Sequence, residues 1–128
     1  MKKNIIVVQI QKAMKVVFDF TTNPINTPLW IDDIEIEEST DWPIKLGTIY
    51  KNKNKAGQWF KYKVISLESN KLFELMSEDN NYHVRYTYKK IGKNTTEMEY
   101  LEWVERGDID IPFTQDILDK LKIVIEKK

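Results

Sequence analysis

Glu102 is the residue of this sequence whose position most suggests chemistry. It lies in a strand pattern over residues 95–105, in which Met98 and Tyr100 precede it at two-residue steps and therefore share its face of a sheet. If the strand is regular, Glu102 points inward, where burial would disfavour its charged form and make it a candidate acid, base or ligand anchor. A β-bulge near Leu101 would instead turn this carboxylate towards solvent. Both orientations are compatible with the sequence.

Aromatic side chains recur at the same alternating spacing on other strand patterns. Hydroxyls of tyrosines on an inner face could orient a polar group of a ligand within an apolar pocket. The same side chains could equally be ordinary members of a packed core. The residues that share faces in this way are Phe60, Tyr62 and Val64; Tyr86 and Tyr88; and Met98 and Tyr100.

The sequence offers little for nucleophilic or metal chemistry. It contains no cysteine, and His83 is the only histidine, so neither a thiolate site nor a histidine cluster can form. His83 alternates with the tyrosines of its strand, which predicts a solvated outer face shared with Arg85 and Thr87. No glycine-rich phosphate loop is present. We therefore expect no metal site and no cofactor.

A group of acidic residues resembles a ligand set only by composition. Glu35 and Glu37 alternate with Ile34 and Ile36, a pattern typical of a half-buried strand with a solvated acidic face. The whole group comprises Asp32, Asp33, Glu35, Glu37 and Glu38. We expect these carboxylates to face water.

The elements that position these residues are mostly strands. Pro24 disfavours helical geometry in the residue before it, so a helix that begins near Ala13 must end near Asn23. Turn residues recur at short, regular intervals after residue 46, which predicts an antiparallel meander. The expected strands are 4–10, 34–36, 47–54, 59–67, 72–77, 82–89 and 95–105, with a short second helix at 26–30.

The last stretch, Pro112 to Lys128, has the spacing of an amphipathic helix. Pro112 suits a first helical position, and such a helix would be about 25 Å long, enough to lie across a curved sheet. Its apolar residues recur at three- and four-residue steps and so form one stripe. They are Phe113, Ile117, Leu118, Leu121, Val124 and Ile125.

Composition narrows the possible partners. The 128 residues include 20 basic and 20 acidic side chains, so no net charge attracts a polyanion, and nucleic acid is not expected as a partner. No apolar run approaches the roughly 20 residues of a membrane span. The first residues read as a strand rather than as a signal peptide. Together with the lack of cysteine, this predicts a cytoplasmic protein with one domain over residues 1–128.

The segment from Val17 to Trp30 resembles the first-helix signature of the START-like superfamily, also called SRPBCC or polyketide cyclase and lipid transport. In that signature a Val-Phe-Asp helix is followed by an Asn-Pro pair and a tryptophan. Leu46-Gly47-Thr48 and the Tyr86-Thr87-Tyr88 strand with the Gly92 turn are also similar to the family. Met14 departs from it, because a proline is frequent near the start of that helix. The matching first-helix residues are Val17, Phe18, Asp19, Asn23, Pro24, Asn26, Pro28 and Trp30.

This resemblance implies an α+β helix-grip fold, in which a seven-stranded antiparallel sheet wraps around the C-terminal helix. The element order would be one strand, two helices, six strands and the long helix. Members of the family enclose a cavity for hydrophobic or amphipathic molecules, and they include lipid and hormone carriers, aromatase/cyclases and chaperone co-factors. The fold alone does not choose among these functions.

Our expectation is a protein that binds a small hydrophobic or aromatic ligand between sheet and helix, as a monomer or weak dimer. Trp30 is expected at one mouth of the cavity. A cyclase/dehydrase enzyme using Glu102, and a protein-interaction module that docks through the Trp42 and Trp59 region, are the alternatives. The candidate ligand-binding residues are Trp30, Tyr62, Tyr86, Tyr88, Met98, Tyr100, Ile117 and Leu121.

Overall fold

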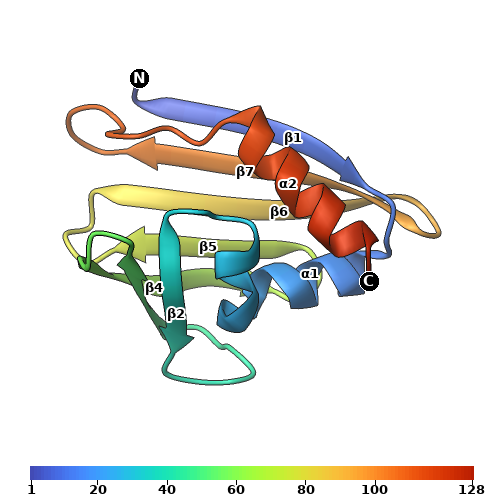
Figure 1. Cartoon of the computed structure of the whole chain (residues 1–128), viewed down its shortest axis with the longest axis horizontal. Coiled ribbons are helices and arrows are strands. Elements are labelled where there is room, and N and C mark those ends of the chain that lie inside the picture. Colours follow the sequence, from blue (N-terminus) through green and yellow to red (C-terminus); the bar gives the residue numbers. More distant parts are fainter.

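Seven antiparallel strands form one curled sheet in the computed structural model, which describes all residues 1–128 (Figure 1). Strands that follow one another from β2 to β7 are neighbours, and β1 pairs with β7, so the order is β1-β7-β6-β5-β4-β3-β2. The strands are β1 (Lys3–Ile10), β2 (Ile34–Ser39), β3 (Ile49–Asn54), β4 (Trp59–Glu68), β5 (Leu72–Ser77), β6 (Tyr82–Gly92) and β7 (Thr95–Val104).

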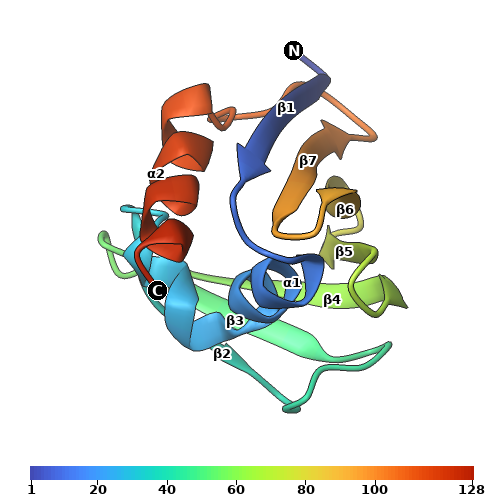
Figure 2. The ribbon, with the colours of Figure 1, turned by 90° about the vertical axis from the view of Figure 1, so that its right-hand side faces the viewer.

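Three helical segments cover the concave side of this sheet. They are α1 (Met14–Thr22), the 3-10 helix η1 (Pro24–Leu29) and α2 (Gln115–Glu126). Figure 2 shows the sheet curling from β1 round to β2, with α2 lying across the open side and α1 closing the space near the middle. The α+β helix-grip architecture predicted from the sequence is confirmed.

The long helix begins later than its sequence predicts. Pro112 and Phe113 precede α2, which starts at Gln115 with Thr114 at its N-cap position. The reason is that Phe113 is committed elsewhere: its backbone N–H donates to Glu102 and its ring stacks on Tyr100. At 12 residues, α2 is about 18 Å long rather than 25 Å.

One part of the concave side is fully packed. Leu118, Leu121 and Ile125 of α2 are completely buried, as are Met98 of β7 and Ile10 of β1. The three α2 residues belong to the apolar stripe that the helical spacing predicted, and Met98 and Ile10 are buried on the strands. Burying each large aliphatic side chain contributes roughly 1.5 to 3 kcal/mol, so the C-terminal helix is a principal source of stability.

Irregularities in the ladder affect which side chains point inward. The pairing of β2 with β3 shifts between Ile34 and Ile36, and that of β4 with β5 shifts between Val64 and Ser66. A bulge reverses the alternation beyond it. Ile36 is therefore exposed, and Glu37 turns inward. The prediction that Glu37 lies on a solvated edge face is wrong for this reason.

His83 is also less exposed than its pattern predicts. It does lie on the outer face of β6, but the ring of Trp103, its cross-strand partner on β7, stacks on it at 4.6 Å. Arg85 lies over the same tryptophan at 5.2 Å. A large aromatic neighbour thus buries a side chain that strand alternation alone would leave in water.

Neither α1 nor α2 has the length and apolar character that a helix needs to cross a membrane.

Candidate functional site

A cavity of about 430 Å³ lies inside the curl of the sheet. Its floor is formed by the inner faces of β3 to β7, and most of its cover is formed by two connecting segments. The helical segments reach it only at single residues, which are Thr21 of α1, Thr27 of η1 and Ile117 of α2. The first segment runs from the end of η1 to the first residue of β2 and contributes Ile31 to Ile34. The second joins β7 to α2 and contributes Ile111 to Phe113. The cavity is partly open to solvent, and Ile111 at its rim is 80% exposed.

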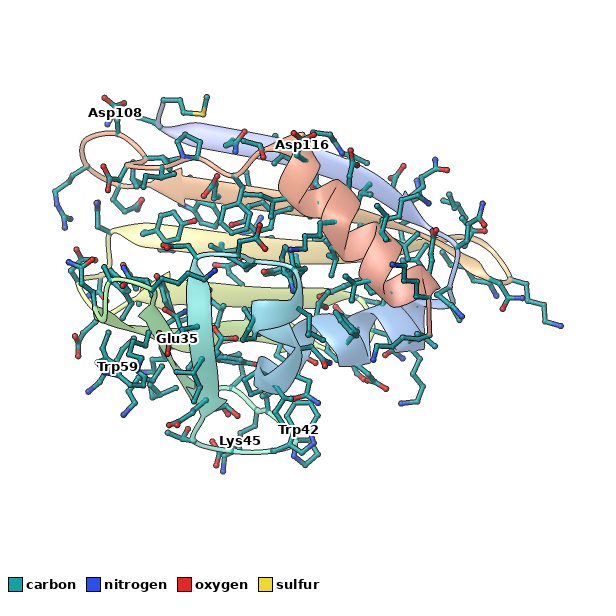
Figure 3. The ribbon with its side chains drawn as sticks, in the orientation of Figure 1. Glu35, Trp42, Lys45, Trp59, Asp108 and Asp116 are labelled. Carbon is teal, nitrogen blue, oxygen red and sulfur yellow. The ribbon has the colours of Figure 1, made fainter.

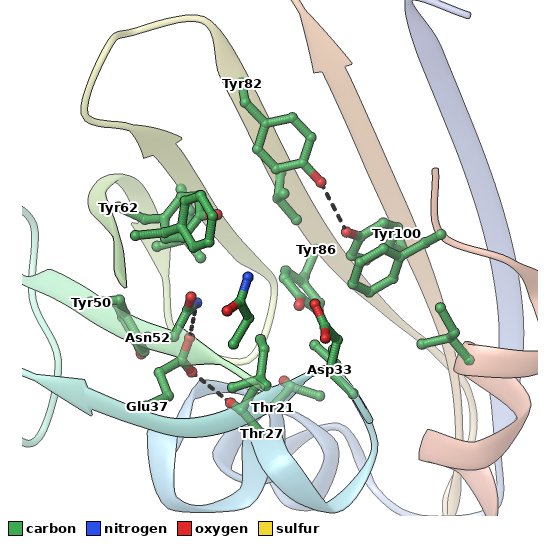
Figure 4. Close-up of a pocket in the computed structure, with 18 of the residues that line it drawn as sticks. Thr21, Thr27, Asp33, Glu37, Tyr50, Asn52, Tyr62, Tyr82, Tyr86 and Tyr100 are labelled. Carbon is green, nitrogen blue, oxygen red and sulfur yellow. Dashed lines mark hydrogen bonds between the residues drawn. The ribbon is translucent and has the colours of Figure 1, made fainter. Parts of the chain in front are cut away.

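Aromatic rings form a continuous wall along this cavity (Figure 4). Ring centroids are 5.6 Å apart between Tyr50 and Phe73, 5.4 Å between Phe73 and Tyr86, and 5.3 Å between Tyr86 and Tyr100. Tyr100 then stacks on Phe113 at 4.6 Å. Tyr50 and Phe73 meet although β4 separates their strands, so the curl of the sheet itself builds the wall.

Glu37 lies at the Tyr50 end of this wall. One of its carboxylate oxygens accepts a hydrogen bond from Thr27 Oγ1 at 2.6 Å, and the other accepts one from Asn52 Nδ2 at 3.0 Å (Figure 4). No Lys, Arg or His pairs with it. Burial raises the pKa of the Glu37 carboxyl above its ordinary range, and the two hydrogen bonds act in the opposite direction.

Several polar atoms on the cavity wall have no partner within the protein. The hydroxyls of Tyr62 and Tyr86 and the side-chain oxygen of Asn52 all line the cavity, and no protein group hydrogen-bonds to them. Tyr86 and Asn52 are each only 6% exposed. Burial raises the pKa of Tyr62 to about 12 and that of Tyr86 well above its ordinary value. These hydroxyls are therefore neutral and available to donate or accept.

The tyrosine hydroxyls elsewhere in the interior are already used. Tyr50 donates to the carbonyl of Thr22, which ties β3 to the end of α1. Tyr88 shares a 2.6 Å hydrogen bond with Thr21 Oγ1. Burial raises the pKa of both phenols, so they remain protonated. Their role is to hold α1 against the sheet.

Glu102 points inward, so the regular strand and not the bulge is the correct alternative. It is completely buried, and β7 pairs without interruption on both sides of it. Its oxygens accept from Asn4 Nδ2 at 2.8 Å, from the backbone N–H of Phe113 at 2.7 Å, and from the hydroxyl of Tyr82. Three donors satisfy this carboxylate, and it does not line the cavity.

The candidate residues from the sequence divide into two groups. Tyr62, Tyr86, Tyr100 and Ile117 line the cavity. Trp30, Tyr88, Met98 and Leu121 do not, because α1, η1 and α2 pack over them and fill the space.

Local packing explains why the residues of the second group do not line the cavity. Trp30 is 2% exposed and meets the edge of Phe113 at 6.3 Å, so it is a core residue behind the cavity wall rather than at its mouth. Tyr88 faces α1, where its ring meets Phe18 at 5.3 Å. The expectation of a cavity directly beneath the C-terminal helix is therefore too simple: only Ile117, in the first turn of α2, reaches it.

Sequence reasoning missed Glu37, Tyr50, Asn52 and Phe73. A signal for two of them is present in β3, where Tyr50 and Asn52 alternate with Lys51 and Lys53. Since lysines avoid an interior face, the other face should have been recognised as the inner one. Glu37 carries no such signal, because the bulge that turns it inward is not visible in the composition of β2.

The rim carries the remaining acidic residues. Asp32 forms an ion pair with Lys120 of α2, which links the two sides of the opening and lowers the pKa of Asp32. Asp33 is exposed. Glu35 points away from the cavity and pairs with Lys53 at 3.8 Å (Figure 3). No three acidic or histidine side chains lie close enough together to hold a metal ion.

Comparison with known proteins gives a result at the level of structure only. No protein-family model and no curated protein matches the sequence. A START superfamily protein from Mycobacterium smegmatis superposes with a TM-score of 0.71 at 13% identity, covering 99% of this chain and 96% of that one. The Aha1 dimer from Colwellia psychrerythraea gives 0.73 at 16% identity, covering 98% and 97%.

A plant enzyme also has a similar structure. Norcoclaurine synthase from Thalictrum flavum, a point mutant in complex with a transition-state analogue, gives a TM-score of 0.66 at 14% identity, covering 98% of this chain and 94% of that one. Identities this low show the fold and nothing more specific. The chain has the START-like helix-grip fold that the segment from Val17 to Trp30 predicted.

Proposed function

We propose that this protein binds a small aromatic or apolar molecule in the cavity between the curled sheet and the two connecting segments. The observation that carries the proposal is the cavity itself: about 430 Å³, open at one side, and walled mainly by apolar and aromatic side chains. This volume falls within the range of roughly 300 to 1,000 Å³ found for small-molecule sites.

The wall suits a flat or aromatic ligand. Rings prefer to meet offset-stacked or edge-on, and Phe73, Tyr86 and Tyr100 present both faces and edges to the cavity. The free hydroxyls of Tyr62 and Tyr86 supply the few polar contacts that fix a ligand's orientation. An entirely filled interior would lack both features.

The cyclase/dehydrase alternative is less well supported. It requires a polar set that converges inside the cavity and includes Glu102. Glu102 instead accepts three hydrogen bonds behind the wall, where it connects β1, β6 and the segment before α2. That arrangement fits a structural role for its carboxylate.

The interaction-module alternative has weaker support as well. Trp42 and Trp59 are both exposed, but they lie at separate places on the periphery (Figure 3). Lys51 and Lys53 lie over the ring of Trp59 at 4.7 and 5.8 Å. Two tryptophans at separate places, one of them beneath two lysine side chains, do not form the contiguous apolar patch that marks a docking surface.

Binding of the neutral fluorophore N-phenyl-naphthylamine tests the proposal. We expect saturable binding to the wild-type protein and its loss in a Leu75→Trp variant, because Leu75 lines the cavity and the larger ring would fill it. Ile5→Trp, on the exposed face of β1, is the matched control and should bind normally. Binding that survives Leu75→Trp unchanged would contradict the proposal. If the fluorophore binds as expected, native mass spectrometry of protein purified from its own host would be used to identify the natural ligand.

A further inference from the structure

The charged residues that line the cavity are all acidic. Its lining includes Asp32, Asp33 and Glu37 but no Lys, Arg or His, although the whole chain has equal numbers of acidic and basic residues. Asp32 is compensated by Lys120 and Asp33 is solvated at the rim. Glu37 is the one carboxylate that faces the cavity from inside without a cation.

The hydrogen bonds of Glu37 leave it incompletely satisfied. A carboxylate can accept about four hydrogen bonds, and Glu37 receives two, both from neutral donors. The hydrogen bonds to Thr27 and Asn52 fix its orientation, since one binds each oxygen. A further donor arriving from the cavity can therefore be accommodated without rearranging the site.

A second, independent observation points to the same place. The hydroxyl of Tyr86 and the side-chain oxygen of Asn52 belong to residues that are more than nine-tenths buried, face the cavity, and have no partner in the protein. No protein group uses these two atoms, so both remain free to bind a polar group of a ligand in the cavity. Both can accept hydrogen bonds, as can Glu37.

We propose that the cavity selects a ligand with a positively charged amine on an aromatic or apolar body, and that Glu37 is the counter-ion of that amine. The inference rests on the proposed function, because it names the class of ligand for the same cavity. An ammonium group brings three donors, which match the acceptors of Glu37, Asn52 and Tyr86. The body of the ligand would lie along the wall from Tyr50 towards Phe113.

Two physical effects favour the cation over a neutral analogue. A hydrogen bond to a charged group is stronger than one between neutral groups, and the partly buried site strengthens it further. Tyrosine faces attract a nearby cation through their negative quadrupole. An anionic ligand would meet only like charge, since the lining holds no basic side chain.

Three probes that share one aromatic body test the selectivity: naphthylethylamine, naphthylethanol and naphthylacetate. Calorimetric titration of the wild-type protein at neutral pH should give a dissociation constant for the amine about tenfold or more below that of the alcohol, with the acetate weakest. This comparison requires no variant. Equal affinity for amine and alcohol would overturn the inference and leave the proposed function standing, whereas failure of all three to bind would overturn both.

A pair of variants locates the selectivity. Glu37→Gln should remove most of the amine's advantage over the alcohol. Glu35→Gln removes the same charge from the same strand on its outward side, and should leave the preference intact. A preference for the amine that persists in Glu37→Gln would show that another group is the counter-ion and would overturn the assignment.

Discussion

The interior of the sheet is divided into a filled half and a hollow half. Where α1 and α2 pack on the sheet, the interior is filled, and residues such as Leu118, Leu121 and Met98 are completely buried. Beneath the connecting segments 31–34 and 111–113, the same sheet carries aromatic rings around a cavity. A helix presents a stripe of side chains that fills the space below it, whereas an extended segment does not. What covers the sheet therefore determines where a ligand has room.

The interior also holds two buried carboxylates, and the protein satisfies them to different degrees. Glu102 accepts from Asn4, Tyr82 and the backbone of Phe113, so its charge is satisfied by the protein. Glu37 accepts only from Thr27 and Asn52 and faces the cavity. The first carboxylate connects structural elements, and the second remains available to a ligand.

Truncating a side chain of the filled half should give the largest effect. Leu121→Ala is expected to lower the free energy of unfolding by about 2 to 5 kcal/mol, because it opens a void in a packed region. Ile117→Ala on the same helix, where the side chain already borders open space, should cost less than half as much. Denaturant unfolding of both variants measures the difference. Equal losses would contradict the division of the interior.

Removing the charge of Glu102 should cost about 1 to 3 kcal/mol of unfolding free energy, because the amide of Glu102→Gln places a donor against donors. Glu99→Gln, on the outer face of β7, should stay within about 0.5 kcal/mol of wild type. A stabilised Glu102→Gln protein would refute the structural role.

Removing a tyrosine hydroxyl should lower stability only where the protein uses that hydroxyl in a hydrogen bond. Tyr50→Phe removes a hydrogen bond to the carbonyl of Thr22 and should cost about 0.5 to 1.5 kcal/mol. Tyr86→Phe removes a hydroxyl without a partner in the protein and should change the unfolding free energy by less than about 0.5 kcal/mol. Thermal unfolding of the pair would test this, and a larger loss for Tyr86→Phe would mean that its hydroxyl has a structural partner.

We expect the smallest effect on stability from Glu37→Gln, whose unfolding free energy relative to wild type should change with pH. A carboxyl whose pKa is raised on folding contributes stability below its ordinary pKa and loses that contribution as pH rises through the folded value. The variant should therefore gain stability relative to wild type as pH rises over that window. Tyr50, Tyr62 and Tyr86 face Glu37, and burial keeps all three protonated there.

Unfolding of wild type and Glu37→Gln from about pH 4 to about pH 8, with Glu35→Gln as the control, would measure this trend. A difference between wild type and Glu37→Gln that stays constant with pH would contradict a raised pKa for the Glu37 carboxyl.

Much of the fold could be predicted from the sequence. Alternation on β6 and β7 placed Tyr86 and Tyr100 on the inner face, and the spacing on α2 gave its buried stripe. For Glu102 the alternation allowed an inward position but did not exclude a bulge. These features depend only on the periods of strands and helices. The meander from β3 to β7 followed from short turns that join neighbouring strands.

The site was harder to predict because it depends on departures from regularity. Glu37 turns inward through a bulge, and Trp30 and Tyr88 are covered by helices whose packing no local pattern reveals. His83 is buried by a partner on the neighbouring strand. Such features depend on tertiary contacts, and a one-residue shift is enough to reverse a face.

Methyl NMR of the protein titrated with naphthylethanol tests the central division most directly. The methyl signals of Leu75, Val84 and Ile117, which line the cavity, should shift with a common dissociation constant. Those of Val8, Leu118 and Leu121, in the filled half, should shift little. Shifts confined to the filled half, or to Ile5 and Val7 on the outer surface, would contradict the account.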